Sequence, residues 1–454
     1  MRPESSWPSA WQQATAQALY DAAVWLVQPL LRRKLRRRGA AEPGYLHAVP
    51  ERFGRYAAAP PRPQPGGQAP LVWIHAVSLG ETRAAAILLG ALRAQWPGMR
   101  LLLTNGTATG RAAGARLLQA GDAQVWQPWD TRGATRRFIA RYRPDVAVLM
   151  ETEIWPNLVR ASHDAGVPLV LANARLSDKS MQGALRVRWL MRPAYARLQA
   201  ALAQTEADAV RLRRAGAPVA GVFGNVKFDA AVDAGLVQLG QRWRAQGQRP
   251  VVMLASSREG EEAAFLDAVQ ALMQGAGPSQ QPQWMIVPRH PQRFDAVAAL
   301  VQERGLSLSR RSQWQHGPEP ADVWLGDSLG EMTAYYALAT AALLGGSFEP
   351  LGGQNMIEAA ACGCPVVMGP HTFNFDEAAA QALRFDAARR VTSMEEGVQA
   401  ALDLVANPAL HEVMARASRI FARKYRGAAA RMARAIAKHL QAQPPGPDGN
   451  TGPT

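Results

Sequence analysis

Three short segments of the chain place a glutamate three residues after a serine or an asparagine. Ser78-Leu79-Gly80-Glu81 and Ser328-Leu329-Gly330-Glu331 are the same tetrapeptide, and Asn355-Met356-Ile357-Glu358 has the same outline. A carboxylate at such a position can act as a general base on a substrate held at the end of a strand. The spacing is also that of a capping box, in which the glutamate folds back onto its own helix start. The sequence leaves both roles open for all three glutamates.

Further polar residues follow the predicted strands of the first half. Glu151 and Glu153 come directly after the apolar segment Val146–Met150, and burying two acids there is costly unless they have a function. The alternative is an acidic helix start that suits the helix dipole. Lys227 follows the last strand of this half, where it can neutralise an anionic sugar or phosphate.

The second half contains features that suit an anionic ligand. Arg289 lies in the segment Pro288-Arg289-His290-Pro291. The two prolines restrict its backbone, which preorganises the arginine for bidentate phosphate binding. His290 is equally compatible with an ordinary turn. Glycines at 345, 346, 352 and 353 let backbone N–H groups approach a ligand closely.

Composition sets limits on fold and partners. The chain has 454 residues and 48% hydrophobic content, which predicts two globular domains. Its net charge of +15 comes without a nucleic-acid motif, so we expect anionic ligands and a membrane surface, and no nucleic acid. The two cysteines, Cys362 and Cys364, are weak evidence for a metal site and suit a reducing, cytosolic compartment.

The N-terminal region has a distinct pattern. An apolar run, Leu19–Leu31, is followed by the basic run Arg32–Arg38. This order is opposite to that of a signal peptide and favours an N-terminal anchor whose basic flank faces the cytoplasm. The run is shorter than the roughly twenty residues of a typical span, so an interfacial helix and a true span both remain open, as does a helix packed on the protein body.

Strand-like and helical segments alternate from Leu71 onward, which predicts parallel sheets flanked by helices. The alternation restarts near Arg249, and a single long helix is expected over His411–Gln441. We therefore expect an anchor at 1–44, a first domain at 45–238, a second at 239–440 and a disordered tail at 441–454. The expected strands are Leu71–His75, Arg100–Thr104, Asp145–Met150, Pro168–Ala172, Leu202–Gln204, Val219–Phe223, Pro250–Ala255, Trp284–Val287, Val323–Leu325, Ala341–Leu344 and Val366–Met368.

An ordered set of motifs resembles the Kdo transferases, which attach 3-deoxy-D-manno-oct-2-ulosonic acid (Kdo) to lipid A precursors. The motifs are HAVSLGET, METEIWPNL, NARLS, GNVKFD, VPRHPQRF and GGQNMIEAAACGCPVVMGPHTFNF. The resemblance implies the α/β GT-B fold, two Rossmann-like domains facing a central cleft. It implies an inverting glycosyltransferase that moves Kdo from CMP-Kdo to lipid IVA in lipopolysaccharide core biosynthesis. The expected location is the cytoplasmic face of the inner membrane.

The same resemblance assigns roles to individual residues. Glu81 corresponds to the general base, and Glu151 and Lys227 to residues that stabilise the transition state. No metal or other cofactor is expected, because the leaving group is a monophosphate and no Asp-x-Asp motif is present. Leu351 and Gln354 depart from the Arg-Gly-Gly-His-Asn form common in the family. The expected contacts to CMP are Pro288, Arg289, Leu329, Gly330, Glu331, Asn355, Met356, Ile357 and Glu358.

Two competing interpretations are compatible with the sequence. Another GT-B nucleotide-sugar transferase, or an epimerase, could use the same two-domain frame. A protein without catalytic activity, such as a two-domain membrane-associated binding protein, would not need Glu81.

Overall fold

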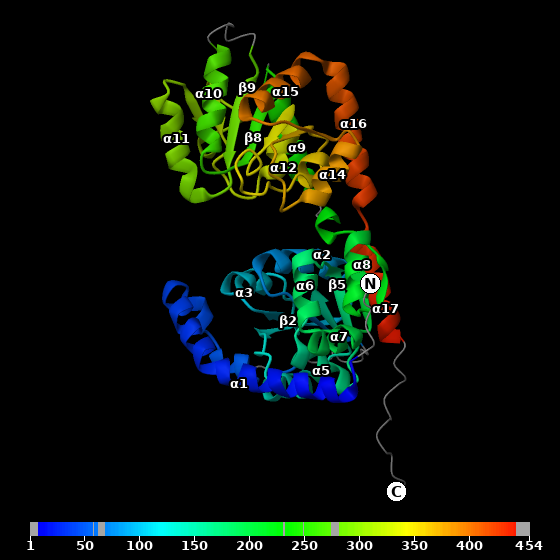
Figure 1. The fold of residues 1–454 in the computed structure, drawn as a ribbon. Coiled ribbons are helices and arrows are strands. Elements are labelled where there is room, and N and C mark those ends of the chain that lie inside the picture. The colour runs from blue at the N-terminus through cyan, green and yellow to red at the C-terminus, as the bar shows by residue number, and fades with distance from the viewer. Residues whose placement is uncertain are drawn as a thin grey trace. The chain divides into compact units, whose positions relative to one another are not determined.

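The computed structural model describes residues 8–57, 59–61, 69–229, 232–247, 249–273 and 281–441. The chain forms two compact units, Met1–Asp229 with Gly427–Thr454, and Ala230–Arg426. Figure 1 shows a sheet flanked by helices in each. Residues 442–454 of the expected tail lie outside the described residues.

The first unit is built on a parallel sheet with strand order β3-β2-β1-β4-β5-β6-β7. The central strands β1 and β4 are fully buried, as strands covered by helices on both faces should be. The strands are β1 Leu71–His75, β2 Arg100–Asn105, β3 Ala123–Trp126, β4 Val146–Met150, β5 Leu169–Ala174, β6 Ala200–Ala203 and β7 Val219–Val222. The helices are α1 Ala10–Ala41, α2 Leu79–Gln95, α3 Ala108–Ala115, α4 Arg132–Tyr142, α5 Pro156–Asp164, α6 Asp178–Arg186, α7 Arg188–Ala196, α8 Glu206–Ala215 and α17 Ala428–Gln441.

The second unit repeats the architecture with strand order β10-β11-β9-β8-β12-β13-β14, again all parallel. Its strands are β8 Val251–Ser257, β9 Gln283–Pro288, β10 Leu308–Arg310, β11 Val323–Leu325, β12 Ala341–Leu344, β13 Val366–Met368 and β14 Ala388–Arg390. Its helices are α9 Ala234–Gln246, α10 Glu261–Met273, α11 Phe294–Glu303, α12 Met332–Leu338, α13 Ile357–Ala361, α14 Asp376–Arg384, α15 Met394–Ala406 and α16 Pro408–Tyr425. The predicted fold class, two parallel α/β domains, is confirmed.

The division between the units falls earlier in the chain than the expected boundary at 238. Helix α9 belongs to the second unit because it packs closely against α12. A Cβ atom on Gly240 would lie 2.1 Å from the Ala334 carbonyl oxygen, so only glycine permits this approach. Trp243 of the same helix stacks on Tyr335, with 6.2 Å between the ring centroids.

The single long helix expected over His411–Gln441 is wrong. Gly427, with φ of 88°, separates α16 from α17. The Asp229 carboxylate accepts hydrogen bonds from the Gly427 and Ala429 backbone N–H groups, which holds the start of α17 on the first unit. Met432 and Ile436 of α17 are buried in the same hydrophobic cluster as α2, and Figure 1 shows α17 within the first unit.

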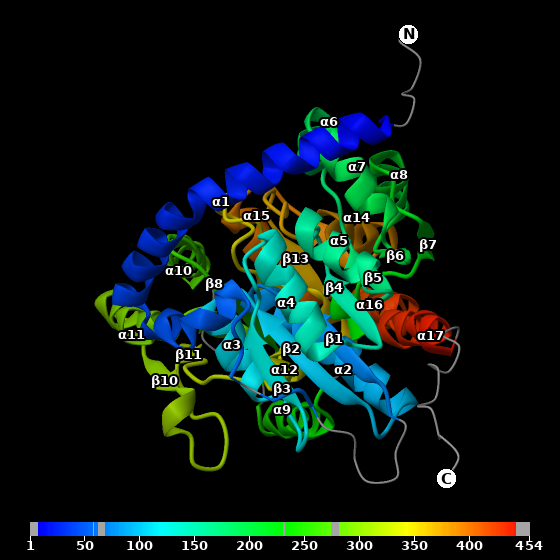
Figure 2. The same ribbon diagram turned by 90° about the horizontal axis from the view of Figure 1, so that it is seen from below.

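The N-terminal region forms one helix, α1, which starts at a capping box between Ser9 and Gln12. In Figure 2 it curves along one side of the first unit, near α7. The Tyr20 hydroxyl donates to Asp130 Oδ2 at 2.8 Å, and Gln17 Nε2 donates to Asn157 Oδ1 at 3.0 Å. Within the described ranges, no helix has both the length and the apolar character required to cross a membrane.

Candidate active site

Glu81 lies at the third position of α2, immediately after the carboxyl end of β1. The Ser78 Oγ accepts a hydrogen bond from the Glu81 N–H at 3.3 Å, as an N-cap should. The Glu81 carboxylate in turn accepts from the Val77 N–H at 2.7 Å and from the Ser78 hydroxyl at 2.9 Å. The glutamate therefore folds back as the capping interpretation predicts, onto the hydroxyl of the N-cap Ser78 and onto the backbone N–H of the residue before it, Val77.

The electrostatic environment of Glu81 is unusual for a capping residue. Burial, followed by the negative charge of Glu153, raises its pKa to about 7, although the hydrogen bonds from Val77 and Ser78 act in the opposite direction. A carboxyl group with this pKa exchanges protons readily near neutral pH, which is the property a general base needs. Capping and catalysis are compatible here, because the same contacts that cap α2 fix the position of the carboxylate.

Glu151 and Lys227 form an ion pair in the first unit. The Lys227 Nζ lies 3.0 Å from Glu151 Oε1, and the Glu151 side chain is only 16% exposed. Glu151 has a φ of 58°, a left-handed conformation that is uncommon outside glycine and is found at functional sites. The structure thus brings together two residues that are 76 positions apart in the sequence.

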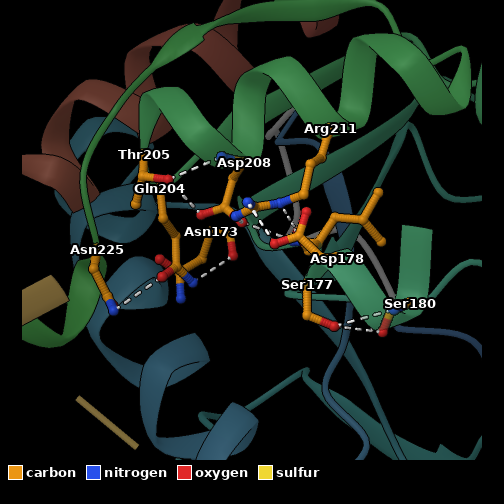
Figure 3. Close-up of polar contacts among 10 residues, drawn as sticks. Asn173, Ser177, Asp178, Ser180, Gln204, Thr205, Asp208, Arg211 and Asn225 are labelled. Carbon is orange, nitrogen blue, oxygen red and sulfur yellow. Dashed lines mark hydrogen bonds and ion pairs between the residues drawn. The ribbon is translucent and has the colours of Figure 1, made fainter. Parts of the chain in front are cut away.

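A polar network at the strand ends positions the segment that carries Lys227. Asn173, at the end of β5, accepts from the Val226 N–H at 3.1 Å through its side chain. The Asn173 carbonyl accepts from Gln204 Nε2 at 2.9 Å, and Asn225 Nδ2 donates to Gln204 Oε1 at 3.1 Å. Figure 3 shows Asn173, Gln204 and Asn225 together, with further polar contacts around Asp208 and Arg211. Lys227 therefore has a fixed backbone although its side chain is partly exposed.

Glu153 was not assigned a role from the sequence, but it belongs to the same group of acids. Burial raises its pKa, and the Trp155 indole N–H donates to Glu153 Oε2 at 2.7 Å. Its negative charge also contributes to the raised pKa of Glu81. The signal in the sequence was the second acid of Glu151-Thr152-Glu153, directly after a buried strand.

The expected nucleotide contacts of the second unit follow the carboxyl ends of β9, β11 and β12, three strands of the same parallel sheet. Pro288 ends β9 and Arg289 follows it with an exposed side chain. The turn Leu329–Glu331 joins β11 to α12, and Asn355–Glu358 leads into α13 after β12. Burial is the main cause that raises the pKa of Tyr336. The charge of Glu358 also raises this pKa and the charge of Arg289 lowers it, so both charges lie near this ring.

Capping was one of the two roles left open for the other two glutamates, and neither carboxylate caps its own helix. Glu331 is itself the N-cap of α12, and its carboxylate binds Arg311 Nη2 at 2.9 Å and the Ser328 hydroxyl. Glu358 Oε1 accepts from the Thr333 hydroxyl at 2.5 Å. These carboxylates therefore join α12 to its surroundings and to α13 instead of closing their own helix starts.

Sequence reasoning missed Glu261, which is buried and shapes the glycine-rich turn after β12. Its carboxylate accepts from the Gly346 N–H at 2.7 Å, the Phe348 N–H at 3.1 Å and the Arg258 N–H at 2.9 Å. A Cβ atom on Gly345 would lie 2.3 Å from the Ser256 carbonyl oxygen, so this turn requires glycine. The two turns that follow β8 and β12 are thereby locked together.

Comparison with known proteins decides the family. A family model described as "3-Deoxy-D-manno-octulosonic-acid transferase (kdotransferase)" matches residues 47–230. The chain is 46% identical to the 3-deoxy-D-manno-octulosonic acid transferase of Bordetella pertussis, over 84% of this chain and 90% of that protein. The chain belongs to the Kdo transferase family. A Haemophilus influenzae protein of the same name is 30% identical over 86% of this chain and 90% of its own length.

Solved structures support the fold of this Kdo transferase. A glycosyltransferase from Rickettsia africae aligns with a TM-score of 0.55 at 10% identity, over 83% of this chain and 100% of that chain. UDP-GlcNAc 2-epimerase from Neisseria meningitidis aligns with a TM-score of 0.54 at 15% identity, over 82% of this chain and 100% of that chain. At these identities the likeness concerns the GT-B fold alone. The Kdo transferase is accordingly a glycosyltransferase of this architecture.

Metal binding was tested on the described part of the chain. No group of three or more His, Cys, Asp or Glu side chains is placed there to hold a metal ion. Cys362 and Cys364 are free thiols in the turn between α13 and β13, and burial raises the pKa of Cys362 to about 12. Metal independence stays a prediction.

Proposed function

We propose that this Kdo transferase moves Kdo from CMP-Kdo to the phosphorylated lipid A precursor lipid IVA, with inversion, in lipopolysaccharide core biosynthesis. The observation that carries the mechanism is the carboxyl group of Glu81, held in place by Val77 and Ser78 with a pKa of about 7. A sugar hydroxyl has a high pKa and needs a positioned base as it attacks. Glu81 removes this proton while the bond to Kdo forms.

The ion pair of Glu151 and Lys227 supplies the electrostatic part of the mechanism. Lys227 provides a positive charge for the carboxylate of Kdo or for charge that develops in the transition state. Glu151 holds the lysine in position at 3.0 Å and balances its charge until the donor arrives. These two residues therefore stabilise the reacting groups without taking the proton.

CMP binds to the second unit through the turns at the ends of β9, β11 and β12. Arg289 carries an exposed guanidinium for the phosphate, which leaves as a monophosphate and needs no divalent metal. Pro288, the turn Leu329–Glu331 and the segment Asn355–Glu358 contribute the remaining contacts. The basic run on α1 attracts the anionic cytoplasmic surface of the inner membrane, where the acceptor resides.

The test is transfer itself. Purified protein is incubated with CMP-Kdo and lipid IVA, and mass spectrometry counts the Kdo residues added to the lipid. UDP-sugars are offered in parallel as donors. Addition of Kdo from CMP-Kdo alone supports the proposal, whereas transfer from a UDP-sugar, or no transfer at all, refutes it.

A further inference from the structure

The first unit contains a mostly apolar cavity of about 440 Å³ between α1 and the body of the domain. This volume lies within the roughly 300–1,000 Å³ typical of small-molecule sites. Val24, Val27 and Leu31 line it from α1, and Val77, Trp129 and Trp155 line it from the body. Helix α1 is fixed over the cavity by the hydrogen bond from Tyr20 to Asp130 at 2.8 Å. The cavity is thus built from several segments that are far apart in the sequence.

The lining of the cavity adjoins two acids, Glu81 and Glu153. Val77 donates its backbone N–H to Glu81 at 2.7 Å, and Trp155 donates its indole N–H to Glu153 at 2.7 Å. Two lining residues therefore contact the proposed base and the acid that raises its pKa.

Three cations, Lys34, Arg38 and Arg52, also line the cavity. Lys34 and Arg38 are exposed, whereas Arg52 is buried and lies 3.9 Å from the centroid of the Trp126 ring. Burial lowers the pKa of Arg52 to about 10, so it keeps its charge at neutral pH, and its Nε has no partner among the described residues. The acid in the lining, Asp130, already accepts hydrogen bonds from Tyr20 and from the start of α5.

From these contacts we infer that the cavity receives an acyl chain of the lipid acceptor. Apolar walls favour a hydrocarbon chain, the cations favour a phosphate attached near it, and Glu81 lies beyond both. Trp25, Leu26 and Leu30 are exposed on α1, and the cavity does not include Leu26 or Leu30. A chain passing from the bilayer would meet these residues first. This inference rests on the proposed function, since it requires an acylated, phosphorylated acceptor.

A pair of adjacent substitutions tests it in the full-length protein. Ala23→Trp places an indole in the cavity, whereas Ala22→Trp places the same group beside a separate cavity near Phe53 and Arg137. KM is measured for lipid IVA and for the same acceptor after its acyl chains have been removed. We expect Ala23→Trp to raise the ratio of the KM for lipid IVA to the KM for the deacylated acceptor by about tenfold. This is the effect of losing a few buried methylene groups. Ala22→Trp should leave the ratio unchanged.

The outcomes separate the two proposals. A wild-type protein that transfers Kdo to neither acceptor refutes the proposed function. If the wild-type protein transfers Kdo but the KM ratio is the same in Ala23→Trp and Ala22→Trp, the inference about the cavity is wrong and the proposed function is unaffected.

A second measurement does not depend on turnover. Lipid IVA with a photoreactive group at the end of one acyl chain should crosslink to Leu31 or Trp129, and Ala23→Trp should suppress this product. Crosslinks confined to Leu26 and Leu30 would show that the chain stays outside the cavity, against the inference.

Discussion

Replacement of Glu153 by Gln should shift the pH profile of Kdo transfer to lower pH. Burial and the charge of Glu153 are the two largest causes that raise the pKa of Glu81 to about 7. The substitution removes the charge while keeping an oxygen for the hydrogen bond from Trp155. The carboxylate of Glu81 then becomes easier to form, and its pKa falls.

The magnitude follows from the pKa of the base. With a pKa of about 7, roughly one tenth of Glu81 is ionised at pH 6. Each further decrease of one pH unit lowers the ionised, active fraction about tenfold. In wild-type protein, kcat/KM should therefore decline below pH 7. In Glu153→Gln the decline should begin at lower pH, so a larger share of the maximal rate remains at pH 6. The maximal rate itself should fall somewhat, because a less basic carboxylate is a weaker proton acceptor.

The assay is the initial rate of Kdo transfer to detergent-dispersed acceptor between pH 5 and pH 9. The matched control is Glu206→Gln, which removes an exposed acid of α8 in the same unit. The control should keep the wild-type profile. An acidic limb that lies at the same pH in Glu153→Gln and in wild type would refute the coupling, and wild-type activity that is undiminished at pH 5 would contradict the raised pKa of Glu81.

Three further predictions concern the donor, the metal and the membrane. Arg289→Ala should weaken CMP and CMP-Kdo binding in parallel by roughly 1.5–3 kcal/mol, because both ligands share the phosphate; unchanged CMP affinity in calorimetry would place the nucleotide elsewhere. Activity should persist in EDTA, and a loss that magnesium restores would contradict the proposed role of Arg289. Replacing the exposed Arg33, Arg36 and Arg37 by Gln should weaken binding to anionic vesicles, measured by sedimentation, by about 1 kcal/mol per charge at low salt. Transfer to detergent-dispersed acceptor should continue. Undiminished sedimentation would show that the membrane contact lies outside this run.

The inner strands of both sheets were predictable from short hydrophobic runs. β1, β11, β12 and β13 have the bounds read from the sequence, since short apolar segments between helical patterns are typical of buried parallel strands. β3, β10 and β14 were missed. Each lies at the edge of its sheet and has only three or four residues, such as Leu308-Ser309-Arg310 and Ala388-Arg389-Arg390. Such segments depend on pairing with a neighbour and carry almost no signal of their own.

The sequence named Glu81, Glu151 and Lys227 as candidates for the site, but it could not supply their contacts. Glu81 could be found from its motif, but its contact with Val77 and its raised pKa depend on folding. The ion pair of Glu151 and Lys227 required the tertiary structure, since nothing local connects β4 with the segment after β7. The packing of α17 on the first unit could not be predicted from the local sequence either. The apolar residues of α17 pack with those of α2, which is more than 300 residues away in the sequence.

The measurement that tests the central claim most directly is single-turnover transfer by Glu81→Gln, followed by mass spectrometry of the lipid. If Glu81 is the general base, the rate should fall by roughly 10²–10⁴-fold. The thermal unfolding temperature and the affinity for CMP should stay close to those of the wild type. A Glu81→Gln protein that adds Kdo at a near-normal rate would show that Glu81 only caps α2, and the proposed mechanism would be wrong.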